Sequence, residues 1–147
     1  MDERIYAQII ADGVHVHPAM IKLSIRAKGI SKIILITDSI RGAGLPDGYY
    51  DKYGKQFTVK DGIARTPRGG LSGSTLTLNK AIKNMIKFTS MPLNDVLPMA
   101  TSVPAEAMGW HNHRGVLKLG ADADVVILNE DFSVEKTFVL GNEVYYK

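Results

Sequence analysis

Two short polar segments, each directly after an apolar run, carry the residue types that could do chemistry. Asp38 follows the apolar run 33–36, and the segment 12–15, Asp-Gly-Val-His, follows the mostly apolar run 5–11. A carboxylate is ionised at neutral pH and can take up and return a proton, and an imidazole can donate or accept one. We therefore consider Asp38 a candidate proton-transfer group, although a turn that Asp38 caps together with Ser39 explains the sequence equally well.

Parallel strands would bring these two segments together. The unbroken apolar run 33–36 favours a strand covered on both faces, as in a parallel sheet. A helix is predicted near 19–28, ended by Gly29, between this run and the run 5–11. The crossover of such a unit is right-handed, so both strands end at the same edge of the sheet, where α/β folds build active sites. The apolar side of the helix is expected to carry Met20, Leu23 and Ala27, widened by Ile21 and Ile25.

The middle of the chain predicts a loop followed by a hairpin. Residues 39–53 are rich in Gly, Pro and Asp and are expected to form a loop. The segments 56–60 and 63–65 are joined by Asp61-Gly62, which suits a tight primed turn. The pattern predicts a β-hairpin insertion near 54–66.

A glycine-rich, hydroxyl-containing turn at 68–75 precedes the clearest helical pattern, which has apolar residues at i, i+3, i+4, i+7 and i+8 from Leu78. Free backbone N–H groups at such a helix start favour anions and polar ligand oxygens. The alternative is a turn in which Ser72 or Ser74 only caps the helix. The P-loop pattern GxxxxGK[ST] is absent from this turn.

The last part of the chain changes from helical to strand periodicity. Short helices are predicted from Pro92 and from Ser102. Strands are predicted at 124–128, 134–140 and 143–146, with Gly141-Asn142 as a hairpin turn. A run of strands after an α/β region indicates a separate small β layer, so we divide the chain into 1–114 and 115–147.

Composition limits the classes of function. The chain has 147 residues, 45% apolar and 22% charged, which is typical of one soluble globular domain. Its 18 Lys and Arg exceed its 15 Asp and Glu only slightly and are scattered, which argues against nucleic acid as a partner. Cysteine is absent, and neither a membrane helix of about 18 apolar residues nor a signal peptide is recognisable. We therefore expect a cytoplasmic protein that binds no membrane.

Four motifs follow one another along the chain: 12–15, Asp-Gly-Val-His; 36–38, Ile-Thr-Asp; 71–77, Leu-Ser-Gly-Ser-Thr-Leu-Thr; and 115–128, Gly-Val-Leu-Lys-Leu-Gly-Ala-Asp-Ala-Asp-Val-Val-Ile-Leu. Together they resemble the N-acetylglucosamine-6-phosphate deacetylases of the amidohydrolase superfamily. The resemblance implies an α/β fold, namely the C-terminal part of a metal-dependent (β/α)8 barrel, with the last two barrel strands and outer helices, plus a small β-sandwich portion.

The resemblance also implies a reaction and the residues that serve it. The family hydrolyses the acetamide of N-acetylglucosamine 6-phosphate to glucosamine 6-phosphate and acetate, in amino-sugar metabolism. Asp38 would act as the general base towards the attacking water and then as the general acid towards the departing amine. His15 would donate to the substrate carbonyl or to a sugar hydroxyl. The implied substrate-binding residues are Asp12, Gly13, Val14, His15, Leu71, Ser72 and Gly73.

A divalent metal, with zinc as the first candidate, is implied for the family, but no metal ligand is implied in this chain. The family's Glu and two His ligands lie upstream of the matching motifs, so we expect a C-terminal fragment that is inactive alone. The spacing of His15 and His17 is like a metal pair, but its position in the chain argues against ligation, and His111 and His113 are expected on a solvated loop. Two alternatives remain: a non-catalytic fragment that associates with itself or with a complementary N-terminal half, and an amidohydrolase acting on a different substrate.

Overall fold

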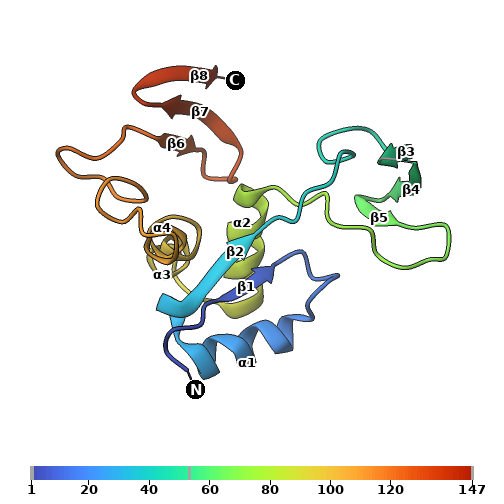
Figure 1. Ribbon diagram of the computed structural model, residues 1–147, viewed down its shortest axis with the longest axis horizontal. Helices are drawn as coiled ribbons and strands as arrows, with labels where there is room; N and C mark the ends of the chain where they lie inside the picture. The colour runs from blue at the N-terminus through green and yellow to red at the C-terminus, as the bar shows by residue number, and fades with distance from the viewer. Residues whose placement is uncertain (1, 53, 147) are drawn as a thin grey trace.

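The computed structural model describes residues 2–52 and 54–146, so Met1, Tyr53 and Lys147 lie outside the described residues. A two-stranded sheet lies at the centre among the helices, and two three-stranded sheets lie at the periphery (Figure 1). The central strands, β1 (Ala7–Ile10) and β2 (Ile33–Ile36), pair in parallel over their whole length. The expected parallel arrangement is therefore confirmed, with β1 shorter than the apolar run 5–11.

Helix α1 (Pro18–Lys28) and the 3-10 turn Ile30–Lys32 connect the two central strands. The helix begins after His17, whose Nδ1 accepts a hydrogen bond from the N–H of Ala19 at 3.2 Å. It ends before Gly29, which has φ +76° and occupies a conformation that suits glycine. The sequence therefore predicts the bounds of α1 to within one residue.

The apolar side of α1 differs from the expected one. Ile21 is fully buried and Ile25 packs against the same core, whereas Met20 and Leu23 are 52% and 55% exposed. The expectation that Met20, Leu23 and Ala27 form the core side is therefore wrong. A helix with apolar residues around most of its circumference offers overlapping stripes, and the position of the sheet selects the stripe of Ile21 and Ile25.

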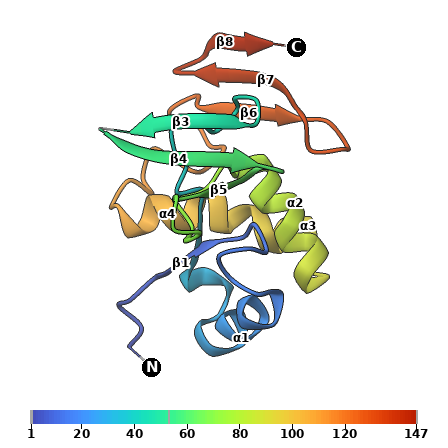
Figure 2. The ribbon, with the colours of Figure 1, turned by 90° about the vertical axis from the view of Figure 1, so that its right-hand side faces the viewer.

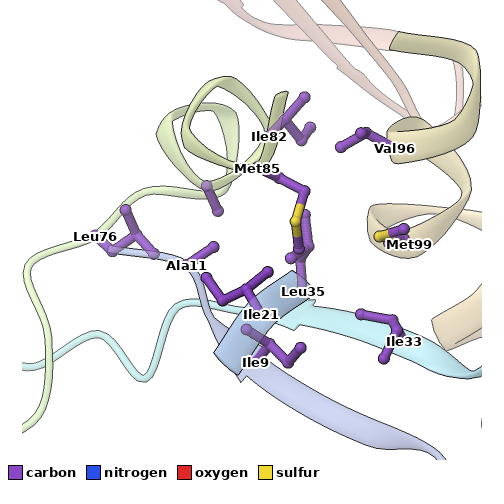
Figure 3. Packing of buried hydrophobic residues seen from close by; sticks show 11 residues of the cluster. Ile9, Ala11, Ile21, Ile33, Leu35, Leu76, Ile82, Met85, Val96 and Met99 are labelled. Carbon is purple, nitrogen blue, oxygen red and sulfur yellow. The ribbon is translucent and has the colours of Figure 1, made fainter. Parts of the chain in front are cut away.

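The main core lies between the central sheet and the later helices (Figure 3). These helices are α2 (Leu78–Thr89), α3 (Leu93–Val96), the 3-10 turn Leu97–Ala100 and α4 (Ser102–Ala107). The strong pattern of α2 is confirmed, because Ala81, Ile82 and Met85 are all buried in the cluster that also contains Ile33 and Leu35 of β2. Within the described residues, no helix is long and apolar enough to cross a membrane.

A small antiparallel sheet follows β2 and has its own core. Its strands are β3 (Gly48–Lys52), β4 (Lys55–Lys60) and β5 (Ile63–Arg65). The predicted hairpin between β4 and β5 is confirmed, with Lys60 opposite Ile63. The expected loop over 39–53 is wrong for β3, because Tyr50 pairs with Phe57 and their rings stack at 5.6 Å between centroids. Tyr53, at the end of that expected loop, lies outside the described residues.

The third sheet contains β6 (Val125–Leu128), β7 (Val134–Val139) and β8 (Asn142–Tyr146), and it projects from the helical part (Figures 1 and 2). The expected turn at Gly141-Asn142 is wrong by one residue, because Leu140 and Gly141 hold the turn with φ +50° and +79°. Leu140 N–H donates to Asp124 Oδ1 at 2.9 Å, which fixes this unusual leucine conformation. Among the described residues after Ala105, none is buried.

The methionines of α1 and α2 provide a matched test of where the core lies. Met85→Ala is expected to lower the free energy of unfolding by about 2–5 kcal/mol, because it opens a cavity at a fully buried position. Met20→Ala, at a half-exposed position, is expected to change it by about 0.5 kcal/mol or less. Urea unfolding of the three proteins measures both values, and equal effects of the two substitutions would contradict the described core.

Candidate functional site

The segment after β1 forms a tight turn that its own carboxylate closes. Asp12 Oδ1 accepts hydrogen bonds from the backbone N–H groups of Val14 and His15, both at 2.9 Å. Asp12 Oδ2 lies 2.6 Å from Nδ1 of the His15 ring. Gly13 has φ +77°, and a Cβ there would approach Cζ of Phe88 to 3.0 Å, so the turn requires glycine. The His15 ring is therefore held against Asp12 by a local and well-defined geometry.

The segment after β2 is fastened to the glycine-rich turn by backbone hydrogen bonds. Ser74 N–H donates to the carbonyl oxygen of Asp38, and Ile40 N–H donates to the carbonyl oxygen of Ser74, both at 2.9 Å. Gly73 has φ +63°, and a Cβ there would overlap the side chain of Ile40. Asp38 adopts φ +48°, a left-handed conformation that aspartate tolerates better than most residues. The Asp38 residue remains exposed at the edge where β2 ends.

The glycine-rich turn does not open helix α2 directly. Residues 74–77 separate Gly73 from the start of α2, and an isolated parallel bridge joins Ser74 to Ser39, beyond the end of β2. Ser74 Oγ accepts a hydrogen bond from Leu76 N–H at 2.8 Å, and the N-cap of α2 is Thr77. Both expectations for this turn, a helix start with free N–H groups and a helix cap by Ser72 or Ser74, are therefore wrong.

A cavity of about 330 Å³ lies beside the turn after β1. Its lining residues are Asp12, Val14, His15, the hairpin residues 61–64, the turn residues 73–76, Lys80, Lys83 and Asn84. Asn84 Nδ2 donates to the carbonyl oxygen of Ala11 at 2.9 Å, which fixes α2 against the end of β1. Thr75 Oγ1 donates to the carbonyl oxygen of Gly62, which joins the glycine-rich turn to the hairpin. The turn after β1, the hairpin, the glycine-rich turn and α2 therefore line one cavity.

The structure brings together some of the expected site residues and separates others. Asp12, Val14, His15 and Gly73 line the cavity, whereas Gly13, Asp38, Leu71 and Ser72 are not among its lining residues. Asp38 nevertheless leaves the sheet at the same edge as the turn 12–15, because Ile10 is paired with Ile36. Ser72 N–H already donates to the carbonyl oxygen of Ala64 at 3.0 Å, so this backbone group is not free for a ligand.

The carboxyl group of Asp12 is the ionisable group that its surroundings affect most clearly at the site. Burial alone would raise the pKa of Asp12, but the backbone N–H of His15, its ring and the N–H of Val14 stabilise the anion. Their sum places the pKa of Asp12 below its ordinary value. The side chains of Asp12 and His15 are only 16% and 17% exposed, so this pair is shielded from water.

The described residues do not by themselves fit a metal site. Within residues 2–52 and 54–146, no group of three or more His, Cys, Asp or Glu side chains is placed to hold a metal ion. The two histidines spaced like a metal pair have different partners, because His15 contacts Asp12 and His17 caps α1. No chemical step is therefore assigned to a metal held by these residues.

Sequence reasoning missed the residues that α2 and the hairpin turn contribute to the cavity. Lys80, Lys83 and Asn84 lie at i, i+3 and i+4 on one side of α2, and Asp61 comes from the hairpin turn. The available signal was the polar stripe on α2. It could not be interpreted from the sequence, because a polar stripe faces solvent unless another segment lies across it.

The model of the amidohydrolase family matches residues 1–144. The N-acetylglucosamine-6-phosphate deacetylase of Vibrio furnissii is 42% identical over 140 residues, which are 95% of this chain and 35% of that protein. The N-acetylgalactosamine-6-phosphate deacetylase of Escherichia coli O157:H7 is 38% identical over 140 residues, which are 95% of this chain and 37% of that protein. The crystal structure of N-acetylglucosamine-6-phosphate deacetylase from Pasteurella multocida matches with a TM-score of 0.91 at 32% identity, over 97% of this chain and 37% of that chain.

This chain therefore spans little more than a third of the length of these similar proteins. The family match nevertheless extends over nearly all of its own residues. The chain belongs to the amidohydrolase family.

Proposed function

We propose that this chain contributes part of the active site of a deacetylase that hydrolyses N-acetylglucosamine 6-phosphate to glucosamine 6-phosphate and acetate. The observation that supports the proposal most is the parallel pairing of β1 with β2, because it delivers Asp38 and the Asp12–His15 turn to one edge. The similar proteins from Vibrio furnissii and Pasteurella multocida carry the name of this activity. Lys80 and Lys83 at the cavity suit an anionic sugar phosphate.

Asp38 is the proposed proton-transfer residue. Its carboxylate takes a proton from the water that attacks the acetamide carbon, and it returns this proton to the amine nitrogen as the C–N bond breaks. The exposed position of Asp38 at the end of β2 leaves its side chain accessible to a substrate. The proposed substrate-binding residues remain Asp12, Gly13, Val14, His15, Leu71, Ser72 and Gly73, although the bond from Ser72 N–H to Ala64 restricts Ser72 to its hydroxyl and carbonyl groups.

The proposed architecture is that of a longer amidohydrolase chain. In it, residues 1–114 contribute the last two strands and outer helices of a (β/α)8 barrel, and residues 115–147 contribute strands of a small β-sandwich. The ligands of the divalent metal, with zinc as the first candidate, belong to the part of such a chain that the match leaves out. The proposed location is the cytoplasm, where a sugar phosphate is available as substrate.

A second proposal concerns the exposed apolar surface of the third sheet. Six apolar side chains on β6, β7 and β8 are between 41% and 73% exposed: Val126, Ile127, Val139, Val144, Tyr145 and Tyr146. Strands with this many exposed apolar residues favour association. The central sheet also favours association, since β1 and β2 pair only with each other among the described strands. Each therefore presents an unpaired edge.

We propose that the remaining part of an amidohydrolase chain covers these surfaces. Two comparisons support this proposal: the similar proteins are almost three times as long as this chain, and 97% of this chain is covered by the match to the Pasteurella multocida structure. Their additional residues are the proposed cover of the surfaces that are exposed here. Self-association through the same sheet is the competing outcome, and the experiments below separate the two.

Replacing the matching third of the Vibrio furnissii protein by this chain provides an assay for Asp38. In this chimera Asp38→Asn is expected to lower the deacetylation rate by about 100-fold to 10,000-fold, because the amide cannot accept the proton. Asp51→Asn on β3 is the matched control and should leave the rate unchanged, since an amide oxygen can still accept the hydrogen bond from Gly54 N–H. An unaltered rate for Asp38→Asn would remove Asp38 from its proposed role.

Substrate choice is tested with the same chimera. We expect N-acetylglucosamine 6-phosphate to be hydrolysed with a higher kcat/KM than N-acetylgalactosamine 6-phosphate. Both sugars are needed, because the similar proteins include deacetylases named for each of them. A preference for the galactose epimer, or hydrolysis of neither compound by a folded chimera, would contradict the proposed substrate.

The isolated chain is expected to hydrolyse no measurable N-acetylglucosamine 6-phosphate and to bind zinc weakly, because the described residues form no metal site. Activity assays and equilibrium dialysis with zinc measure these two properties. Zinc-dependent hydrolysis by the isolated chain would contradict the proposal that the metal ligands lie elsewhere.

Co-expression with the unmatched part of the Vibrio furnissii protein tests the covered surface. We expect a one-to-one complex by light scattering, and Val144→Asp is expected to weaken it about tenfold or more, because a charge would enter an apolar interface. Glu130→Lys, in the exposed connection between β6 and β7, is the control and should leave the mass unchanged. A homo-oligomer that persists in the presence of the second polypeptide would favour self-association instead.

A further inference from the structure

The hydrogen bonds of Asp12 determine which nitrogen of His15 carries a hydrogen. An ionised carboxylate can only accept hydrogen bonds. Asp12 Oδ2 lies 2.6 Å from His15 Nδ1, a distance that requires a hydrogen between the two atoms. The lowered pKa of Asp12 keeps this group ionised at neutral pH, so the hydrogen must belong to Nδ1.

We infer that Asp12 is a positioning residue, which fixes neutral His15 as the Nδ1–H tautomer and so presents the lone pair of Nε2 as a hydrogen-bond acceptor for the cavity. Among the described residues no side chain or backbone group pairs with Nε2, and His15 lines the cavity, so this nitrogen remains available to a ligand. The inference deepens the proposed function, because His15 is one of its substrate-binding residues.

This geometry changes the role expected of His15. In the neutral ring Nε2 has no hydrogen to donate, so it cannot contact a substrate carbonyl as a donor. Its partner is instead a donor on the ligand, such as a sugar hydroxyl or an ammonium group. Donation to a carbonyl requires the protonated ring, in which both nitrogens carry a hydrogen.

The substitution Asp12→Asn is expected to reverse the tautomer rather than merely remove a contact. The backbone N–H groups of Val14 and His15 both donate to Oδ1, so the amide oxygen must take that position. The amide NH₂ group then occupies the place of Oδ2 and faces Nδ1, which must become an acceptor. The ring hydrogen therefore moves to Nε2, as in serine proteases, where the corresponding exchange traps the wrong tautomer.

Nitrogen-15 NMR of the whole chain measures the tautomer directly, because protonated and unprotonated imidazole nitrogens differ widely in chemical shift. Spectra recorded at about pH 9 are well above the ordinary imidazole pKa of ~6.5, so neutral rings dominate. The signals of His15 are assigned by their loss in His15→Gln. We expect hydrogen on Nδ1 in the unmodified chain and on Nε2 in Asp12→Asn, and Asp12→Glu, which restores a carboxylate, should return it to Nδ1.

Asp61→Asn is the matched control, because Asp61 lines the same cavity but has no described contact with His15. It should leave the tautomer unchanged, and a reversal there would show that general loss of charge is responsible. Hydrogen on Nε2 in the unmodified chain overturns the inference even if the Asp12 variants fail to fold. An unchanged tautomer in folded Asp12→Asn overturns it as well. None of these results depends on deacetylase activity, so this inference and the proposed function can fail separately.

Discussion

The parallel pairing of β1 with β2 is the constraint on which the candidate site depends. Four residue pairs, from Ala7 opposite Ile33 to Ile10 opposite Ile36, set the register. Ile9, Ile33 and Leu35 hold this register by burial, because a slip of one residue would turn each of them away from the core. The polar segments emerge directly after the last pair, so their mutual position follows from the buried residues and not from any contact between them.

Two aspartates leave this edge in different environments. Asp12 accepts hydrogen bonds from two backbone N–H groups and lies against a shielded imidazole, so its carboxylate is fully engaged. Asp38 is exposed, and its backbone carbonyl, rather than its side chain, joins the glycine-rich turn. The side chain of Asp12 is therefore held by its neighbours, whereas the exposed side chain of Asp38 is accessible to a substrate, as its proposed role requires.

The two parts of the molecule differ in how many of their residues are buried. The helices and the central sheet share a continuous core, and the β3–β5 sheet has a small core around Phe57. The β6–β8 sheet contributes no buried residue among those described, although its strands are rich in apolar side chains. A three-stranded sheet in which no described residue is fully buried gains little stability from burial, which is why its partner surface matters for the proposed function.

The sequence by itself determined the elements whose signals are local. The unbroken run of β2, the periodic pattern of α2 and the Asp61-Gly62 hairpin each depend on neighbours within about a dozen residues, and all three are present. The predicted strand–helix–strand order also placed Asp38 and the turn 12–15 at one edge, because the right-handed crossover of a βαβ unit makes its two strands parallel.

Only the tertiary structure decided the features that depend on contacts between distant segments. Helix α1 buries Ile21 instead of Met20 because of where the sheet lies, and the end of the glycine-rich turn lies beside the end of β2 because Ser74 N–H donates to the carbonyl oxygen of Asp38. The cavity needs α2, whose Asn84 reaches the end of β1. Such contacts join residues tens of positions apart. Each segment offers several surfaces for contact, and the packing of all the segments together decides which surface is used.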